Sequence, residues 1–165
     1  MSEREVWVKD GGPRLLAGVP CEDLTVSAAM RDGRVSVQRV FYDLYAGEFP
    51  AAFSELNVVT IWSGGKADRE YRVGVRLSGP DGTVLAEAAA LLRGMAAPNT
   101  TVHTVHFASD GGMALVLPAP GRYSVDVLLE EAVVHTFPLH VIQLQAAEAP
   151  QTQTVTETET EEEVS

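Results

Sequence analysis

Histidine supplies the side chains of this sequence most able to bind a metal ion or to transfer a proton near neutral pH. His103 and His106 are three residues apart in one expected strand, and His135 and His140 are five apart in another. Residues an odd number of positions apart on a strand point to opposite faces of its sheet. Neither pair can share a metal ion unless another element helps, so we expect no metal site and no cofactor.

A nucleophile is equally difficult to find in this sequence. Cys21 is the single cysteine, so the chain cannot form an internal disulfide. Glu22 and Asp23 follow it, and neighbouring carboxylates disfavour the thiolate that acts as a nucleophile. The sequence contains no GxSxG motif, and no glycine pair is followed by the GK[ST] of a phosphate-binding loop. We expect no catalytic residue, and we predict that the protein is not an enzyme.

Aromatic residues are better candidates for a binding role, because five rings lie within thirteen residues around Pro50. Two interpretations are open. The rings fill one end of a hydrophobic core, since buried aromatics dominate core area, or they form a patch on the surface, since aromatics are enriched where proteins meet partners. Under the second interpretation the predicted binding residues are Phe41, Tyr42, Tyr45, Phe49, Phe53 and Trp62.

Strands must position these residues, because the hydrophobic pattern has a period of two along most of the chain. In residues 70–78, EYRVGVRLS, large apolar residues alternate with Arg, Gly and Ser, as in a half-buried strand. The turn GPDG at 79–82 then reverses the chain. Residues 83–94, TVLAEAAALLRG, are rich in alanine, which favours a helix by propensity. The segment between the two turn signals is short for a helix, so a strand is predicted.

Further strands are expected on both sides of this hairpin. Residues 21–30 are expected to form one strand, and residues 35–45, VSVQRVFYDLY, are predicted to form one long strand. The segment 51–56, AAFSEL, has the length and composition of a single helical turn. A closing hairpin spans residues 120–144, in which Pro138 lacks a backbone donor and indicates an edge strand or a bulge.

About seven to nine short strands with turn signals between them predict an all-β sandwich or barrel. We expect an N-terminal arm or edge strand over residues 1–19 and the β-sandwich domain over 20–144. Residues 145–165 are rich in Thr and Glu and have no hydrophobic periodicity, so a disordered acidic tail is predicted there.

The net charge of the chain disfavours some classes of binding partner. The chain has a formal net charge of −11 at pH 7, with two lysines and scattered arginines. Such a chain repels phosphate and lacks the clustered cations that nucleic-acid binding needs. No apolar segment approaches the length that spans a bilayer, and the N-terminus lacks the pattern of a signal peptide. We expect no nucleic-acid partner, no membrane partner and a cytoplasmic location.

Three segments together resemble a known family: VSVQRVFYDLYAGEFPAAFSELNVVTIWS, YRVGVRLSGPDGTVLAE and PGRYSVDVLLEEAVVHTFPLHV. The chain is similar to a family of small bacterial proteins of unknown function with an immunoglobulin-like β-sandwich. The resemblance covers roughly residues 20–142. It implies an antiparallel immunoglobulin-like sandwich and implies no catalytic residue.

Two functions follow from these patterns. The first is a non-enzymatic interaction or accessory module that binds a protein partner or a second copy through an edge strand and the aromatic cluster. The alternative is a binder of a small apolar or carbohydrate-like ligand, in a pocket near Tyr42, Tyr45 and Trp62. A hydrolase or metalloenzyme would need the histidines to cluster with an acid in the folded chain.

Overall fold

The computed structural model describes residues 11–26, 35–53, 56–93, 100–107 and 114–145, and within these ranges the side chains of 23–26, 35–36 and 100–107 are not described. The secondary structure of this part of the chain is strand and turn, without a helix. Its strands are β1 (Pro13–Val26), β2 (Val35–Val40), β3 (Asp43–Ala46), β4 (Ala51–Phe53), β5 (Leu56–Gly64), β6 (Glu70–Ser78), β7 (Val84–Arg93), β8 (Thr100–Phe107), β9 (Leu115–Leu117), β10 (Gly121–Leu129) and β11 (Ala132–Gln143).

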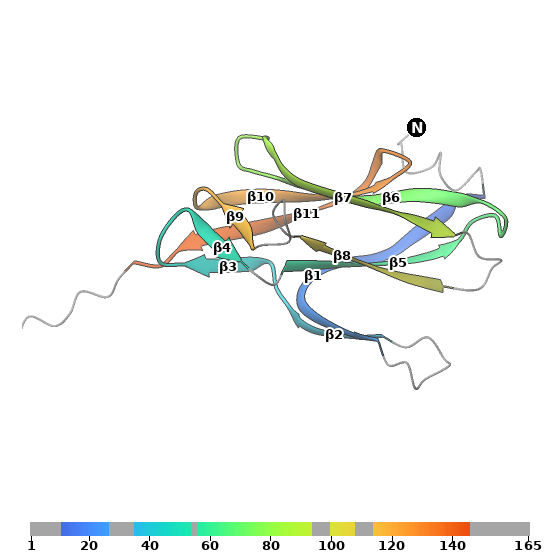
Figure 1. Cartoon of the computed structure of the whole chain (residues 1–165), viewed down its shortest axis with the longest axis horizontal. Helices are drawn as coiled ribbons and strands as arrows, with labels where there is room; N and C mark the ends of the chain where they lie inside the picture. The colour runs from blue at the N-terminus through green and yellow to red at the C-terminus, as the bar shows by residue number, and fades with distance from the viewer. Residues whose placement is uncertain (1–10, 27–34, 54–55, 94–99, 108–113, 146–165) are drawn as a thin grey trace, which may run out of the picture.

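Two sheets face each other across a hydrophobic core (Figure 1). One sheet has the order β2-β1-β5-β8, and the other has the order β3-β11-β10-β6-β7. A two-stranded ribbon, β4-β9, lies at the end of the molecule where β3 is found (Figure 1). The pairs are antiparallel except that β3 runs parallel to β11. The predicted all-β sandwich is confirmed, and the strands beyond the expected number include the short β3, β4 and β9.

The core confirms the alternation in β6 and β10. In β6 the side chains of Tyr71, Val73, Val75 and Leu77 are buried. The neighbouring strand β10 buries its own alternate set, and β5 contributes from the opposite sheet. Because each strand gives every second residue to the space between the sheets, the two inner faces interdigitate as in other sandwiches. The central residues from β5 and β10 are Leu56, Val58, Trp62, Tyr123, Val125, Val127 and Leu129.

Tyr123 makes a hydrogen bond that is typical of the topology of this sandwich. Its side chain is fully buried near the start of β10, and its hydroxyl donates to the Ala119 carbonyl at 2.6 Å. A tyrosine that bonds in this way to the backbone a few residues upstream is the tyrosine corner of immunoglobulin-like Greek-key sandwiches. The bond fixes the connection from β9 to β10 where the chain changes sheets.

The single long strand predicted over residues 35–45 is wrong. The segment is divided into β2 and β3, which belong to different sheets. Arg39 has a φ of 51°, in the left-handed region that interrupts a regular strand. The Phe41 amide then donates to the Pro20 carbonyl, and the chain crosses to the second sheet. Strand pairing also overrides the expected helical turn, since residues 51–53 form β4 and residues 54–55 lie outside the described ranges.

The alanine-rich segment is a strand, as predicted. β7 pairs with β6 over Val84–Arg93, and a bulge near Leu85 separates the regular ladder from the GPDG turn. In that turn the Gly82 amide donates to the Gly79 carbonyl at 2.9 Å, and Gly82 has a φ of 83°. A side-chain-bearing residue would be strained there.

Pro138 lies at a local edge of β11. The His140 amide donates to the Tyr42 carbonyl at 2.7 Å, so by alternation the backbone of position 138 faces the same side. β3 pairs with β11 only from His140 to Gln143. The missing donor of Pro138 therefore points to a side where the described residues provide no strand.

The expected domain limits differ from the observed strands at the N-terminus. β1 begins at Pro13 and lies between β2 and β5, so residues 13–19 are part of a sheet. The predicted tail falls outside the described residues, except for Gln145.

Candidate binding surface

The six predicted binding residues occupy three environments. Trp62 is 1% exposed, and its indole Nε1 donates to Thr60 Oγ1 at 2.9 Å within the core. Phe41, Phe49 and Phe53 are partly buried and pack against the core. Tyr42 and Tyr45 are exposed, at 41% and 55%. The structure therefore divides the aromatic cluster between the two interpretations that the sequence left open.

The two tyrosines belong to the end of the five-stranded sheet, where β3 is the edge strand. Tyr42 precedes β3 and its ring makes an edge-to-face contact with Phe137 of β11, with ring centroids 6.0 Å apart. This contact fixes the Tyr42 ring. Tyr45 lies opposite Ile142 in the parallel ladder, and both side chains are exposed.

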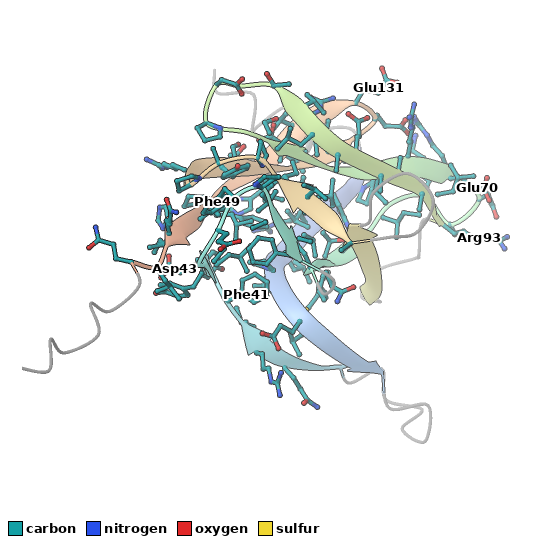
Figure 2. All side chains as sticks on the ribbon, turned by 60° about the vertical axis from the view of Figure 1, so that its left-hand side comes forward. Phe41, Asp43, Phe49, Glu70, Arg93 and Glu131 are labelled. Carbon is teal, nitrogen blue, oxygen red and sulfur yellow. The ribbon has the colours of Figure 1, made fainter. Side chains whose placement is uncertain are left out.

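A polar pair holds the same ladder together. Asp43 Oδ1 and His140 Nδ1 are 3.0 Å apart, and both side chains are about half exposed. Asp43 lies opposite His140 in the register, two residues before the Tyr45–Ile142 pair. Figure 2 shows Asp43 pointing outward at this end of the molecule, with Phe41 and Phe49 set further in.

We define the β3 surface as Tyr42, Asp43, Tyr45, His140, Ile142 and Leu144. Leu144 is 53% exposed, and its amide donates to the Ala46 carbonyl at 2.8 Å. The sequence reasoning missed Ile142 and Leu144 and also the Asp43–His140 pair. The alternation His-Val-Ile-Gln-Leu at 140–144 was the only signal for them, and it does not tell which segment lies alongside.

His135 is not part of this surface. It is partly buried, and its ring centroid lies 6.1 Å from that of Phe137. His103 and His106 lie in β8, where side chains are not described. Among the described residues, no group of three or more His, Cys, Asp and Glu side chains is arranged to hold a metal ion. Within the same ranges no helix is long and apolar enough to cross a membrane.

Two shallow depressions lie elsewhere, on the outer face of the five-stranded sheet. One, of about 390 Å³, has a floor at Gly74, Ala89 and Leu128. Its rim carries two ion pairs, Arg72–Glu131 and Arg76–Glu87, at 3.0 Å and 2.8 Å. The hydrogen bond to Glu87 raises the pKa of Arg76 above its ordinary value. Opposite charges on this rim are therefore already paired.

The second depression, of about 420 Å³, lies beside the GPDG turn and the start of β10. Neither depression is lined by any of the six predicted binding residues. The aromatic residues thus lie on a surface or in the core and do not line these depressions.

A comparison with known protein families assigns the chain to one of them. The model of a family of unknown function, DUF6941, matches residues 24–142. The chain belongs to this family. The DUF6941 match covers the region from the last residues of β1 nearly to the end of β11, which confirms the resemblance to a family of unknown function. A search of curated protein sequences finds no match.

Three solved structures are similar to this chain at low identity and low TM-score. A β-glucosidase from Listeria innocua in complex with isofagomine is 14% identical with a TM-score of 0.44, over 80% of this chain and 16% of the enzyme. The alkylpurine DNA glycosylase AlkC from Pseudomonas fluorescens is 14% identical with a TM-score of 0.37, over 61% of this chain and 27% of that chain.

An immunoglobulin-like protein from Pseudomonas aeruginosa is 11% identical with a TM-score of 0.37, over 79% of this chain and 96% of that protein. The chain thus spans less than a third of the β-glucosidase and of the DNA glycosylase. At these values the similarities carry no argument about the activity of the DUF6941 chain.

Proposed function

We propose that this protein is a non-enzymatic interaction module that binds a protein partner through the β3 surface. One observation carries the proposal: Tyr45 is exposed opposite Ile142 in the β3–β11 ladder at the edge of a sheet, and Leu144 is exposed two residues after Ile142. Tyrosine is enriched among the interface residues that contribute most of the binding free energy. The non-enzymatic part rests on the sequence, which offers no nucleophile motif.

The backbone of β3 supports the same role. The carbonyls of Tyr42 and Ala46 accept bonds from His140 and Leu144 of the neighbouring segment. By alternation, the N–H and C=O groups of Asp43 and Tyr45 point the opposite way, toward the open edge. An extended peptide that adds a strand to such an edge gains backbone hydrogen bonds, while exposed side chains give specificity.

A protein surface fits these residues better than a small-ligand pocket does. The ligand alternative needed Tyr42, Tyr45 and Trp62 to surround one cavity. Trp62 is enclosed in the core, whereas Tyr45 is 55% exposed at the edge of the other sheet. Small-ligand sites are concave and bury most of the ligand, and an edge strand with exposed side chains favours a larger, flatter partner.

The test is affinity capture from a lysate of the producing organism, with quantitative mass spectrometry. Tyr45→Ser removes the more exposed ring, and Leu16→Ser is the matched control because Leu16 is 51% exposed on β1 in the other sheet. We expect a protein captured by the wild type and by Leu16→Ser, and depleted about tenfold or more with Tyr45→Ser. Equal capture by all three proteins would overturn the proposal.

A further inference from the structure

The second edge of the five-stranded sheet is β7. β6 pairs with one side of this ten-residue strand, and the described residues provide no strand on its other side. In Figure 1, β7 lies in front of the other strands of the five-stranded sheet and extends along most of the length of this sheet. Exposed edges usually carry charged side chains, especially Lys, or Pro or a bulge that prevents pairing with another chain. Residues 86–93, AEAAALLR, contain no Lys and no Pro, and the bulge near Leu85 lies outside them. Their two charged residues, Glu87 and Arg93, have opposite signs and can therefore attract a second copy.

Backbone bonds show which residues of β7 face the open side. The Glu130 amide donates to the Arg72 carbonyl at 2.8 Å, so the backbone groups of Arg72 face β10. By alternation those of Val73 face β7, where the register partner is Ala90. Ala90 therefore faces β6. The N–H and C=O groups that point to the open edge belong to Glu87, Ala89, Leu91 and Arg93.

The side chains of these four residues are also exposed, on the outer face of the sheet. Leu91 is 65% exposed, more than the other large apolar side chains described as exposed. Ala89 lies opposite Gly74, so small side chains occupy the middle of this edge and bulky side chains do not block the approach of another strand there. A long edge with free backbone groups and an exposed Leu is the kind of surface that pairs with another strand.

We propose that β7 pairs antiparallel with β7 of a second copy of this chain, across a twofold axis at Ala90. Backbone hydrogen bonds form between the two copies only where an outward-facing residue of one β7 lies opposite an outward-facing residue of the other. The two strands can therefore shift relative to each other only in steps that keep outward-facing residues opposite outward-facing residues. With the axis at Ala90, Glu87 lies opposite Arg93 of the other copy and Ala89 lies opposite Leu91. By the twofold symmetry each of these contacts occurs twice.

Charge complementarity selects this alignment. Within one copy, Arg76 lies opposite Glu87 and bonds it, and Glu70 lies opposite Arg93. Figure 2 shows Arg93 and Glu70 close together at one end of the molecule. When Glu87 meets Arg93 of the other copy, four adjacent strands present a row of alternating sign: Arg76, Glu87, Arg93 and Glu70. An axis at Glu87 or at Arg93 would instead place like charges opposite each other, which destabilises a sheet.

The proposed dimer joins two five-stranded sheets into one and leaves both β3 surfaces at the far ends. It goes beyond the proposed function, because it uses the opposite edge of the sheet. If both hold, the dimer presents two partner-binding surfaces, and binding to a partner with repeated sites gains avidity.

The test uses the full chain and measures mass by sedimentation velocity over a range of concentrations. We expect the wild type to form a dimer. Glu87→Arg alone and Arg93→Glu alone place like charges opposite each other, so each raises the dissociation constant about tenfold or more. An equimolar mixture of the two variants restores both opposite-charge contacts, so heterodimer forms at wild-type concentrations.

Three further variants keep this test independent of folding and of the β3 surface. Arg122→Glu makes the same change from Arg to Glu as Arg93→Glu does, but at an exposed residue of β10. We expect this variant to leave the dimer intact. Tyr45→Ser also leaves it intact. Ala89→Pro removes an outward donor and abolishes the dimer, with circular dichroism confirming the fold of each variant.

A wild type that stays monomeric, or a mixture that fails to recover the dimer, would overturn the inference. Loss of the dimer with Tyr45→Ser would also overturn it, because the copies would then meet at β3. The capture experiment with Tyr45→Ser tests the β3 proposal separately, so either proposal can fail alone.

Discussion

The two edges of the five-stranded sheet, β3 and β7, differ in length, in direction relative to the neighbouring strand and in the side chains that they carry. β3 has four residues, runs parallel to its neighbour and carries exposed tyrosines and an Asp–His pair. β7 has ten residues, runs antiparallel and carries alanines with one charge of each sign. Short edges offer few backbone groups, so their specificity must come from side chains. Long flat edges offer a backbone ladder, and charge placement then selects the alignment.

The difference indicates where the proposed binding at each edge would gain its free energy. At β3, large rings would contribute apolar area, and Phe137 contacts the Tyr42 ring. At β7 the small side chains would contribute little area, and the outward-facing backbone groups would dominate. We therefore expect side-chain substitutions to affect β3 binding most, and substitutions of charge or backbone to affect β7 pairing most.

The largest effect is expected from a core substitution that affects both edges together. Leu77 is fully buried in β6, between the two edges. Leu77→Ala removes buried methyl groups and leaves a cavity, so the free energy of unfolding falls by about 3 kcal/mol. Denaturant titration followed by circular dichroism measures it. A loss under about 1 kcal/mol would mean that the core relaxes around the cavity.

A proline pair separates the two sides of β7. Ala90→Pro removes a donor that faces β6 and leaves its acceptor unpaired, which lowers the free energy of unfolding by about 2 kcal/mol. Ala89→Pro removes a donor that faces the open edge, so its effect on the monomer is under about 1 kcal/mol. Denaturant titration at low protein concentration compares the two. Equal losses would contradict the assigned backbone directions.

The two tyrosines of the β3 surface should differ in their effect on stability. Tyr42→Leu loses the edge-to-face contact with Phe137, and the free energy of unfolding falls by about 1 kcal/mol. Tyr45→Leu changes an exposed side chain and costs under about 0.5 kcal/mol. Thermal melts of both variants measure the difference. If Tyr45→Leu were the more destabilising, Tyr45 would be a structural residue and the β3 surface would need to be redrawn.

The smallest effect concerns the turn that leads into β7. Hydrogen bonds from the Thr83 amide and hydroxyl lower the pKa of Asp81 below its ordinary value of 3.8. The ionised carboxylate therefore stabilises the fold above that pH, and this stabilisation is lost as the pH falls through the lower pKa of the folded state. Denaturant titration from neutral pH to strongly acidic pH should show a flatter acid limb for Asp81→Ala. An unchanged acid limb would remove Asp81 from the groups that support this turn.

Several features of the fold were predictable from local patterns. Alternation identified β6 and β10 and the residues that they bury, because each strand alternates between the core and the opposite face. The GPDG turn and the short interval before the next turn signal identified β7 as a strand in spite of its alanines. The sheet change near Arg39 was not predictable, because a residue in the left-handed region carries no signal when it is not glycine.

The residues of the proposed β3 surface were predictable only in part. The sequence selected Tyr42 and Tyr45 together with Trp62, since all are aromatic and near turns. Burial then separated them, with Trp62 in the core and Tyr45 at an edge. Ile142 and His140 complete the surface from a strand about a hundred residues further along the chain, and no local pattern reveals that partnership.

The sequence by itself determined that the chain forms strands, where β6, β7 and β10 lie, and which faces of β6 and β10 are apolar. These properties depend on neighbours within a few residues, so alternation and turn chemistry are sufficient to predict them. Only the tertiary structure decided that β3 lies parallel to β11 and that β7 ends the sheet. Strand order depends on contacts between distant segments that bury apolar area together, and the surfaces available for binding are the edges which that order leaves open.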